Sequence, residues 1–258
     1  MYWLLYQSNP WLLPIVMLVV LGFAIEGPAR YGQRLVAKVQ VDNDGWNVIQ
    51  GGILTLVAFM LGISFSQSQA RFDSRRELVV KEANAIGTTW LRADQLALAD
   101  SERFRTVLRD YTSLRLEAYR GNVSREELAR AQAQSDAAQG QLWILASSGL
   151  RAQPQNLGRS LLMETLNDTI DVSAEELQAL THHVPTVIMA MTVGLVVLGA
   201  LIMGLSFART GKPPRVLAVA YALSTVIVLS MMLDLDRPQT GFVHVNLDPL
   251  VVQLNSMR

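Results

Sequence analysis

The chain has 258 residues, of which 50% are hydrophobic and 17% are charged, and its formal net charge at pH 7 is zero. The charged fraction is below the roughly 25% usual in soluble domains, and the balanced charge gives no basic field that would indicate a nucleic-acid partner. The sequence contains no cysteine, which excludes disulfide bonds, thiolate metal sites and cysteine nucleophiles.

The apolar residues are gathered into four runs with the length and composition of membrane-spanning helices. A helix that rises 1.5 Å per residue needs roughly 17–25 apolar residues to cross a hydrocarbon core of about 30 Å. We therefore predict transmembrane helices at about residues 11–25, 48–65, 184–208 and 216–233. The first run is the shortest, and a re-entrant segment is the alternative for it. The segment 209–215 contains a glycine and two prolines and predicts a tight turn between the third and fourth helices.

The polar middle of the chain predicts a helical insert outside the membrane. Apolar side chains recur at helical spacing beyond the second span, with no proline among them, at Phe72, Val79, Ala83, Ile86 and Trp90. The second transmembrane helix should therefore continue past the membrane for several turns. Three more helices are expected around 104–114, 128–145 and 161–170, the second of them started by a capping box at Ser124 and Glu127.

The predicted fold class is an all-α integral membrane protein with four transmembrane helices and a long helical insert between the second and third. Residues 1–66 carry the first two spans, 67–183 form the insert, 184–233 carry the last two spans, and 234–258 form a C-terminal tail outside the membrane.

Loop charges give conflicting indications of orientation. Positive charge on short loops marks the cytoplasmic side. The basic residues of the two short loops are Arg30, Arg34, Lys38, Arg209, Lys212 and Arg215, which places the insert on the periplasmic side. Four basic residues just beyond the second span, Arg71, Arg75, Arg76 and Lys81, favour the opposite orientation. The periplasmic placement is our expectation and the cytoplasmic placement is the alternative.

Two stretches resemble a known family. Residues 65–96 read FSQSQARFDSRRELVVKEANAIGTTWLRADQL, and residues 233–250 read LDLDRPQTGFVHVNLDPL. With the order of the spans, they resemble the bacterial membrane proteins that carry a bestrophin-like domain, and the likeness covers nearly the whole chain. The motifs RxELVxxEANAIGTxxLRA and DLDRPxxGxxxVxxxPL carry it.

The resemblance implies a layout and a class of function. Bestrophins are pentameric anion channels with four spans and a helical region between spans two and three, and the layout here is similar. The likeness therefore implies a homo-oligomer, a pentamer if the similarity is close, in the bacterial inner membrane, with anions as the permeating species. In bestrophins the helical region is cytoplasmic, opposite to the placement by loop charge. The acidic calcium-binding cluster of bestrophins is not recognisable here, so calcium gating is not implied.

One face of the second span is a candidate pore lining. Thr55, Phe59, Gly62 and Ser66 follow one another at steps of four, three and four and so share a helix face. Small and polar residues on such a face can line a pore, with Phe59 as an apolar constriction. The alternative is packing between helices, which also favours small residues.

Charged residues at two edges of the membrane have candidate roles. Arg71, Arg75 and Arg76 could concentrate anions at a pore mouth in a ring of subunits, or could lie on an interfacial helix paired with acidic neighbours. Asp234, Asp236 and Arg237 follow the fourth span and mark either a permeation pathway or a structural lock. We favour a lock in which an aspartate pairs with an arginine of the extended second helix.

The sequence gives no indication of an enzyme. Glu82 is expected to hold the insert in place rather than to catalyse, because no second catalytic group is tied to it by spacing. His182 and His183 are adjacent, and neighbours on a helix diverge by about 100°, which disfavours a shared metal. No nucleotide-binding glycine loop or hydrolase motif is present, and we expect neither a cofactor nor a metal.

Two functions fit these observations. The first is an oligomeric channel or transporter for anions. The second is a membrane scaffold or envelope sensor that transports nothing and acts through its helical insert, an alternative favoured by the size of the insert and by the absence of charged residues inside the spans.

Overall fold

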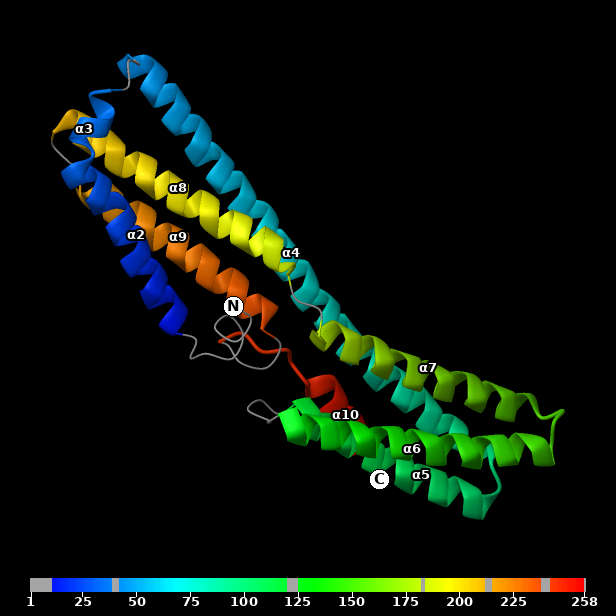
Figure 1. Cartoon of the computed structure of the whole chain (residues 1–258). Helices are drawn as coiled ribbons and strands as arrows, with labels where there is room; N and C mark the ends of the chain where they lie inside the picture. Colours follow the sequence, from blue (N-terminus) through cyan, green and yellow to red (C-terminus); the bar gives the residue numbers. More distant parts are fainter. Residues whose placement is uncertain are drawn as a thin grey trace. The chain divides into compact units, whose positions relative to one another are not determined.

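The structure is a computed structural model that describes residues 11–38, 42–119, 125–181, 184–211, 215–237 and 242–257, and these residues form helices and connecting segments without a strand (Figure 1). Among the described helices, four are long and apolar enough to cross a membrane. They are α2 (Leu12–Tyr31), α4 (Asn43–Arg92), α8 (Thr186–Thr210) and α9 (Arg215–Asp236). The predicted fold class, with four spans and a long helical segment between the second and third, is confirmed.

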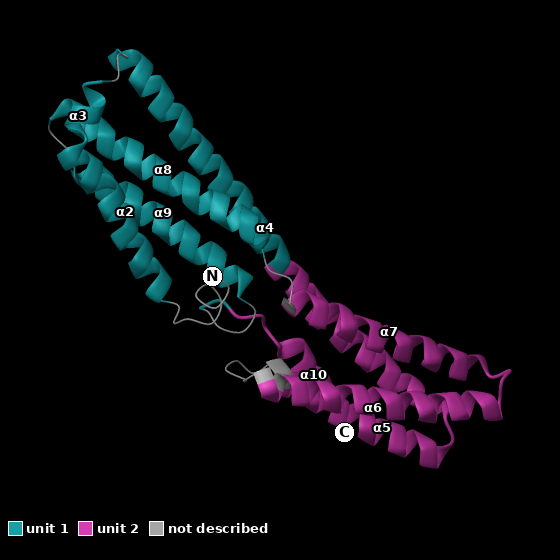
Figure 2. Cartoon of the chain, in the orientation of Figure 1, with its two compact units in different colours: residues 1–71, 183–243 teal, residues 72–182, 244–258 magenta. Residues whose placement is uncertain are grey.

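The chain divides into two compact units, coloured separately in Figure 2. Unit 1 comprises residues 1–71 and 183–243, and unit 2 comprises residues 72–182 and 244–258. Helix α4 is 50 residues long and contributes to both units, as the uninterrupted helical spacing beyond the second span predicted. The division falls at residues 71 and 72, five residues beyond the expected start of the insert, and the C-terminal tail is shared between the units.

Unit 1 packs α2, α8, α9 and the first part of α4 around an apolar core. The core includes Leu21 of α2, Val196 of α8 and Leu229 of α9, all almost fully buried. Hydrogen bonds between side chains join α4 to α8: Trp46 Nε1 donates to Ser206 Oγ at 3.0 Å, and the hydroxyls of Ser64 and Thr192 lie 2.9 Å apart. The short helix α3 (Gln33–Val36) follows α2.

Helices α2 and α8 approach closely because glycine occupies position 204. A Cβ atom added there would lie 2.3 Å from the carbonyl oxygen of Ile25 in α2. Gly204→Ala should therefore force the helices apart, and such overpacking costs about 1–3 kcal/mol. We expect the apparent melting temperature of the purified protein to fall by roughly 2–12 °C.

A matched control lies on the same helix at Gly194, where an added Cβ would meet no atom within 4 Å. Because alanine is favoured over glycine inside a helix by about 0.5–1 kcal/mol, Gly194→Ala should leave the melting temperature unchanged or raise it slightly. Equal effects of the two substitutions would contradict the close approach of α2 to α8.

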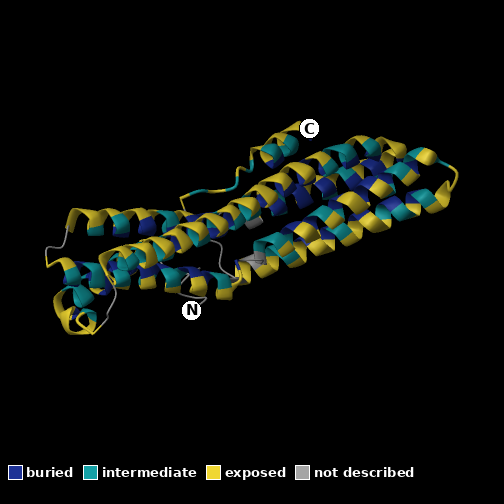
Figure 3. Cartoon of the chain, turned by 90° about the horizontal axis from the view of Figure 1, so that it is seen from above, coloured by how far each residue is buried: buried dark blue, intermediate teal, exposed yellow. Residues whose placement is uncertain are grey.

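Unit 2 is a bundle of the second part of α4 with α5 (Leu98–Tyr119), α6 (Arg125–Ala152) and α7 (Leu157–Thr181). Buried residues, dark blue in Figure 3, lie on the sides of these helices that face one another. On these four helices, the apolar and aromatic core residues with no exposed surface include Ile86, Phe104, Leu108, Tyr111, Leu142, Leu162 and Leu166. Val79 and Ala83, which were predicted at the helical spacing of α4, belong to the same core.

Two arginines join the ends of the helices in unit 2. Arg159 Nε donates to the carbonyl oxygen of Gln95 at 2.9 Å, in the short 3₁₀ helix η1 (Ala93–Gln95). Arg92 Nη1 donates to the carbonyl oxygen of Leu161 at 2.7 Å. The Gln95 carbonyl lies at the end of η1, where carbonyl groups lack intrahelical partners, so the bond from Arg159 satisfies such a group.

Among the described residues, the structure adds helix α10 and the short helices α3 and η1, which the sequence did not predict, and it leaves three predicted features untested. Helix α10 (Asp248–Ser256) has Pro249 in its first turn and places Leu250 in the core of unit 2. Ser124 of the predicted capping box, the pair His182 and His183, and residues 212–214 of the predicted tight turn lie outside the described residues.

Candidate functional site

The face of α4 that was predicted to line a pore is exposed in the single chain. Thr55, Gly62 and Ser66 are exposed, and 61% of the Phe59 surface is accessible. An added Cβ at Gly62 would meet no atom within 4 Å. Unit 1 therefore leaves this face largely uncovered among the described residues.

The opposite face of α4 carries the packing within unit 1. Val57, Ser64 and Ser68 lie about 180° around the helix from the exposed face and are buried. The hydroxyl of Ser64 reaches Thr192 of α8, as described above. Packing inside the subunit therefore does not explain the small and polar residues on the exposed side.

The three arginines proposed for a pore mouth occupy three different environments. Arg71 is half-buried in unit 1, and its Nε has no hydrogen-bond partner among the described residues. Arg75 is 3% exposed in unit 2 and donates from Nε to the carbonyl oxygen of Ala179 in α7 at 3.1 Å. Arg76 is exposed. Arg75 therefore joins α4 to α7, and only Arg76 presents a freely accessible guanidinium.

The acidic residues at the end of α9 bind backbone N–H groups of unit 1. The Asp234 carboxylate accepts from the N–H of Phe242 at 2.8 Å and from the N–H of Val243 at 2.9 Å. Asp236 has no exposed surface and accepts from the N–H of Val184 at 3.1 Å, next to the start of α8. Arg237 is also buried. These contacts hold the chain segments around α9 together. The expected pairing of an aspartate with an arginine of α4 stays a prediction.

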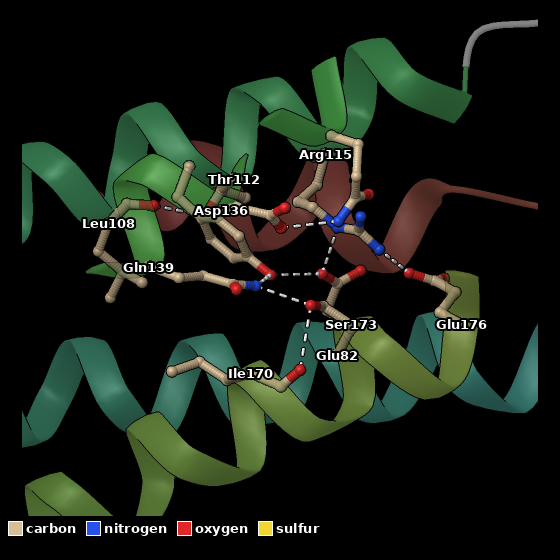
Figure 4. Close-up of polar contacts among 11 residues, drawn as sticks. Glu82, Leu108, Thr112, Arg115, Asp136, Gln139, Ile170, Ser173 and Glu176 are labelled. Carbon is tan, nitrogen blue, oxygen red and sulfur yellow. Dashed lines mark hydrogen bonds and ion pairs between the residues drawn. The ribbon is translucent and has the colours of Figure 1, made fainter. Parts of the chain in front are cut away.

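A polar cluster lies inside unit 2, and we call it the Arg115 cluster (Figure 4). Its members are Glu82, Tyr111, Arg115, Gln139, Ser173 and Glu176. Arg115 Nε donates to Glu82 Oε1 at 2.7 Å, and Arg115 Nη2 donates to Glu176 Oε2. The three charged side chains are at most 4% exposed and come from α4, α5 and α7, so one ion-pair network joins three helices of the bundle.

The cluster is not arranged as a metal or cofactor site. No three histidine, aspartate or glutamate side chains converge as possible metal ligands anywhere in the described segments. The two glutamates share an arginine between them, and a guanidinium in that position would repel a metal cation.

Comparison with known proteins identifies the family. The sequence profile described as "Bestrophin-like domain" matches residues 17–250. The chain belongs to the bestrophin-like family.

The fold of this bestrophin-like protein is similar to crystal structures of a bacterial bestrophin homologue from Klebsiella pneumoniae. One of them is 16% identical, with a TM-score of 0.67 and coverage of 96% of this chain and 96% of that chain. A tryptophan-to-alanine variant from the same organism is 16% identical, with a TM-score of 0.68 and coverage of 98% and 95%. At this identity the similarity establishes the shared fold. No curated protein matches the sequence.

Sequence reasoning singled out Glu82 in the bestrophin-like protein but missed its partners. Arg115 lies four residues after Tyr111 and seven after Leu108, in phase with the buried face of α5. Glu176 follows Leu162, Leu166, Thr169 and Ser173 on the buried face of α7 in the same way. A charged residue at a core position of an amphipathic helix was the available signal, since such residues are rarely buried without a partner.

Proposed function

We propose that the protein is one subunit of a homo-oligomeric anion channel in the bacterial inner membrane, with the exposed face of α4 lining the pore. The observation that carries the proposal is that Thr55, Phe59, Gly62 and Ser66 share a face that the subunit leaves uncovered. The bestrophin-like family membership supports the same conclusion and favours a pentamer.

The chemistry of this face suits water and ions better than lipid. Hydroxyl groups exposed to hydrocarbon lack water as a hydrogen-bond partner, whereas the same groups in a pore are hydrated. Phe59 would form an apolar ring around the axis, and such rings impede ions by excluding water. Arg71 and Arg76, beyond the membrane-spanning stretch, would raise the local concentration of anions.

The test is anion flux into liposomes that contain the purified protein. Phe59→Ala should increase chloride flux severalfold, because a smaller side chain widens the constriction and allows it to hydrate. Arg71→Ala should lower chloride flux, because it removes a positive charge close to the permeation path.

Phe23→Ala provides the matched control, since Phe23 lies on α2 with 75% of its surface exposed and is not on the proposed pore face. It should leave the flux unchanged. A wild-type protein that conducts no anions, or a monomer in lipid, would contradict the channel and favour the scaffold or sensor function. A flux that neither Phe59→Ala nor Arg71→Ala alters would contradict this pore lining.

A further inference from the structure

The hydroxyl and amide groups of the Arg115 cluster already donate to partners. The Tyr111 hydroxyl donates to Glu82 Oε1 at 3.0 Å, and Arg115 Nε donates to the same oxygen. Gln139 Nε2 donates to Ser173 Oγ at 2.7 Å and to the Tyr111 oxygen at 3.4 Å. The Ser173 hydroxyl in turn donates to the carbonyl oxygen of Ile170 at 3.1 Å. The hydroxyl and amide hydrogens directed into the cluster are therefore already in use.

Two carboxylate oxygens of the cluster receive no hydrogen bond from the described residues. Glu82 Oε2 and Glu176 Oε1 are buried and have no hydrogen-bond partner among the described residues. Both side chains are almost inaccessible, with exposures of 0% for Glu82 and 2% for Glu176. A buried carboxylate oxygen without a donor is costly, and two ionised carboxylates beside one guanidinium would leave a net negative charge in the core.

We propose that the Arg115 cluster is a proton-binding site, in which one proton is shared between the carboxyl groups of Glu82 and Glu176. A single proton turns one of the two carboxylates from an acceptor into a donor, and it brings the charge of the three side chains to zero. Glu82 Oε1 accepts from both Tyr111 and Arg115, whereas Glu176 accepts from Arg115, so we assign the proton to Glu176.

The electrostatics agree with this geometry. Burial and the negative charge of Glu82 raise the pKa of Glu176 to about 9, although the charge of Arg115 acts in the opposite direction. Burial and the charge of Glu82 also raise the pKa of Tyr111, so the phenol remains a donor.

Each helix packed around Glu176 contributes a defined set of groups. The charged or titratable groups that face it are Glu82 from α4 and Tyr111 and Arg115 from α5. Helix α6 presents the neutral amide of Gln139, while its Asp136 is exposed and bonded to Gln132. Helix α10 is followed by Met257, whose sulfur lies 3.9 Å from the Thr112 hydroxyl.

The proton links the packing of unit 2 to pH. The folded chain holds a proton that an unfolded glutamate, with a pKa of about 4.3, releases. Stability from this proton is fully present below about pH 4.3 and declines as the pH rises toward the folded-state value of about 9. In that window the equilibrium constant for folding should fall by up to about tenfold per pH unit. Above the window, repulsion between the carboxylates should loosen α7 from α4.

Infrared spectroscopy of the wild-type protein in lipid nanodiscs tests the site without a variant. The C=O stretching band of a protonated carboxylic acid should be present at pH 7 and should disappear reversibly on alkalinisation. Absence of that band at pH 7 would overturn the proposal.

Glu176→Gln tests the assignment and the linkage, because its amide can donate to Glu82 and accept from Arg115 as the protonated acid does. This variant should lack the band, and its melting temperature should fall less between pH 6 and pH 9 than that of the wild type. Glu175→Gln is the control, since Glu175 is the exposed neighbour on α7. This variant should keep the wild-type infrared band and the wild-type fall in melting temperature between pH 6 and pH 9. If the band persists in Glu176→Gln, or if its melting temperature falls with pH as much as that of the wild type, the assignment to Glu176 is contradicted.

Discussion

Replacing Arg115 with leucine should destabilise the protein more than any other single substitution considered for unit 2. The guanidinium bonds to both Glu82 and Glu176 in a core where the three side chains are at most 4% exposed. Removing one partner from a buried charge network costs about 3–5 kcal/mol, because the remaining charge is neither solvated nor paired. For a chain of this length, the loss corresponds to roughly 6–20 °C in apparent melting temperature.

The loss of stability in Arg115→Leu should depend on pH. This dependence distinguishes the effect of losing the charge from the effect of losing packing. At acidic pH both glutamates can become neutral in the variant, so the difference from wild type should shrink. Arg109→Leu on the same helix is the control, because Arg109 is exposed and such surface changes are usually within about 0.5 kcal/mol. Arg115→Lys should be intermediate, since lysine keeps the charge but cannot bond both carboxylates with a planar fork. A pH-independent deficit, or one matched by Arg109→Leu, would show that the charge network is not what Arg115 contributes.

The four spans and the helices of the insert could be predicted because their signals are local. Long apolar runs and helical periodicity depend only on residues near one another in the sequence. The expected helices around 104–114, 128–145 and 161–170 correspond to α5, α6 and α7. The short helix α10 was missed because nine residues carry little periodic signal.

The partners of the charged residues could not be predicted because they come from distant helices. Glu82 and Arg115 are 33 positions apart, and Arg115 and Glu176 are 61 positions apart. Arg75 was grouped with its neighbours by sequence alone, yet rotation around α4 buries Arg75 and leaves Arg76 exposed. Similarly, helical spacing showed that Thr55, Phe59, Gly62 and Ser66 share a face, but only the packing of α4 on α8 shows that this face is uncovered.

Asp236→Leu should also destabilise the protein strongly, through the lock between α9 and the start of α8. The carboxylate of Asp236 accepts the N–H of Val184, and both residues are buried. Leucine removes the acceptor and leaves that N–H unpaired, at a cost of about 1–3 kcal/mol. The loss of a negative charge near the positive end of α8 adds about 0.3–1 kcal/mol. The apparent melting temperature in detergent should fall by roughly 3–16 °C.

Asp236→Asn separates the contribution of the hydrogen bond from that of the charge, because asparagine keeps an acceptor oxygen while losing the charge. It should therefore lower the melting temperature less than leucine does. Asp168→Leu and Asp168→Asn on α7 are the matched controls, since Asp168 is exposed and both changes should have little effect. The oligomer size should be measured in parallel, because a loosened junction between α8 and α9 would alter the surface of unit 1 available to a neighbouring subunit. If neither stability nor oligomer size changes in either Asp236 variant, Asp236 is not a lock, and its burial at the end of a span would then need a different explanation.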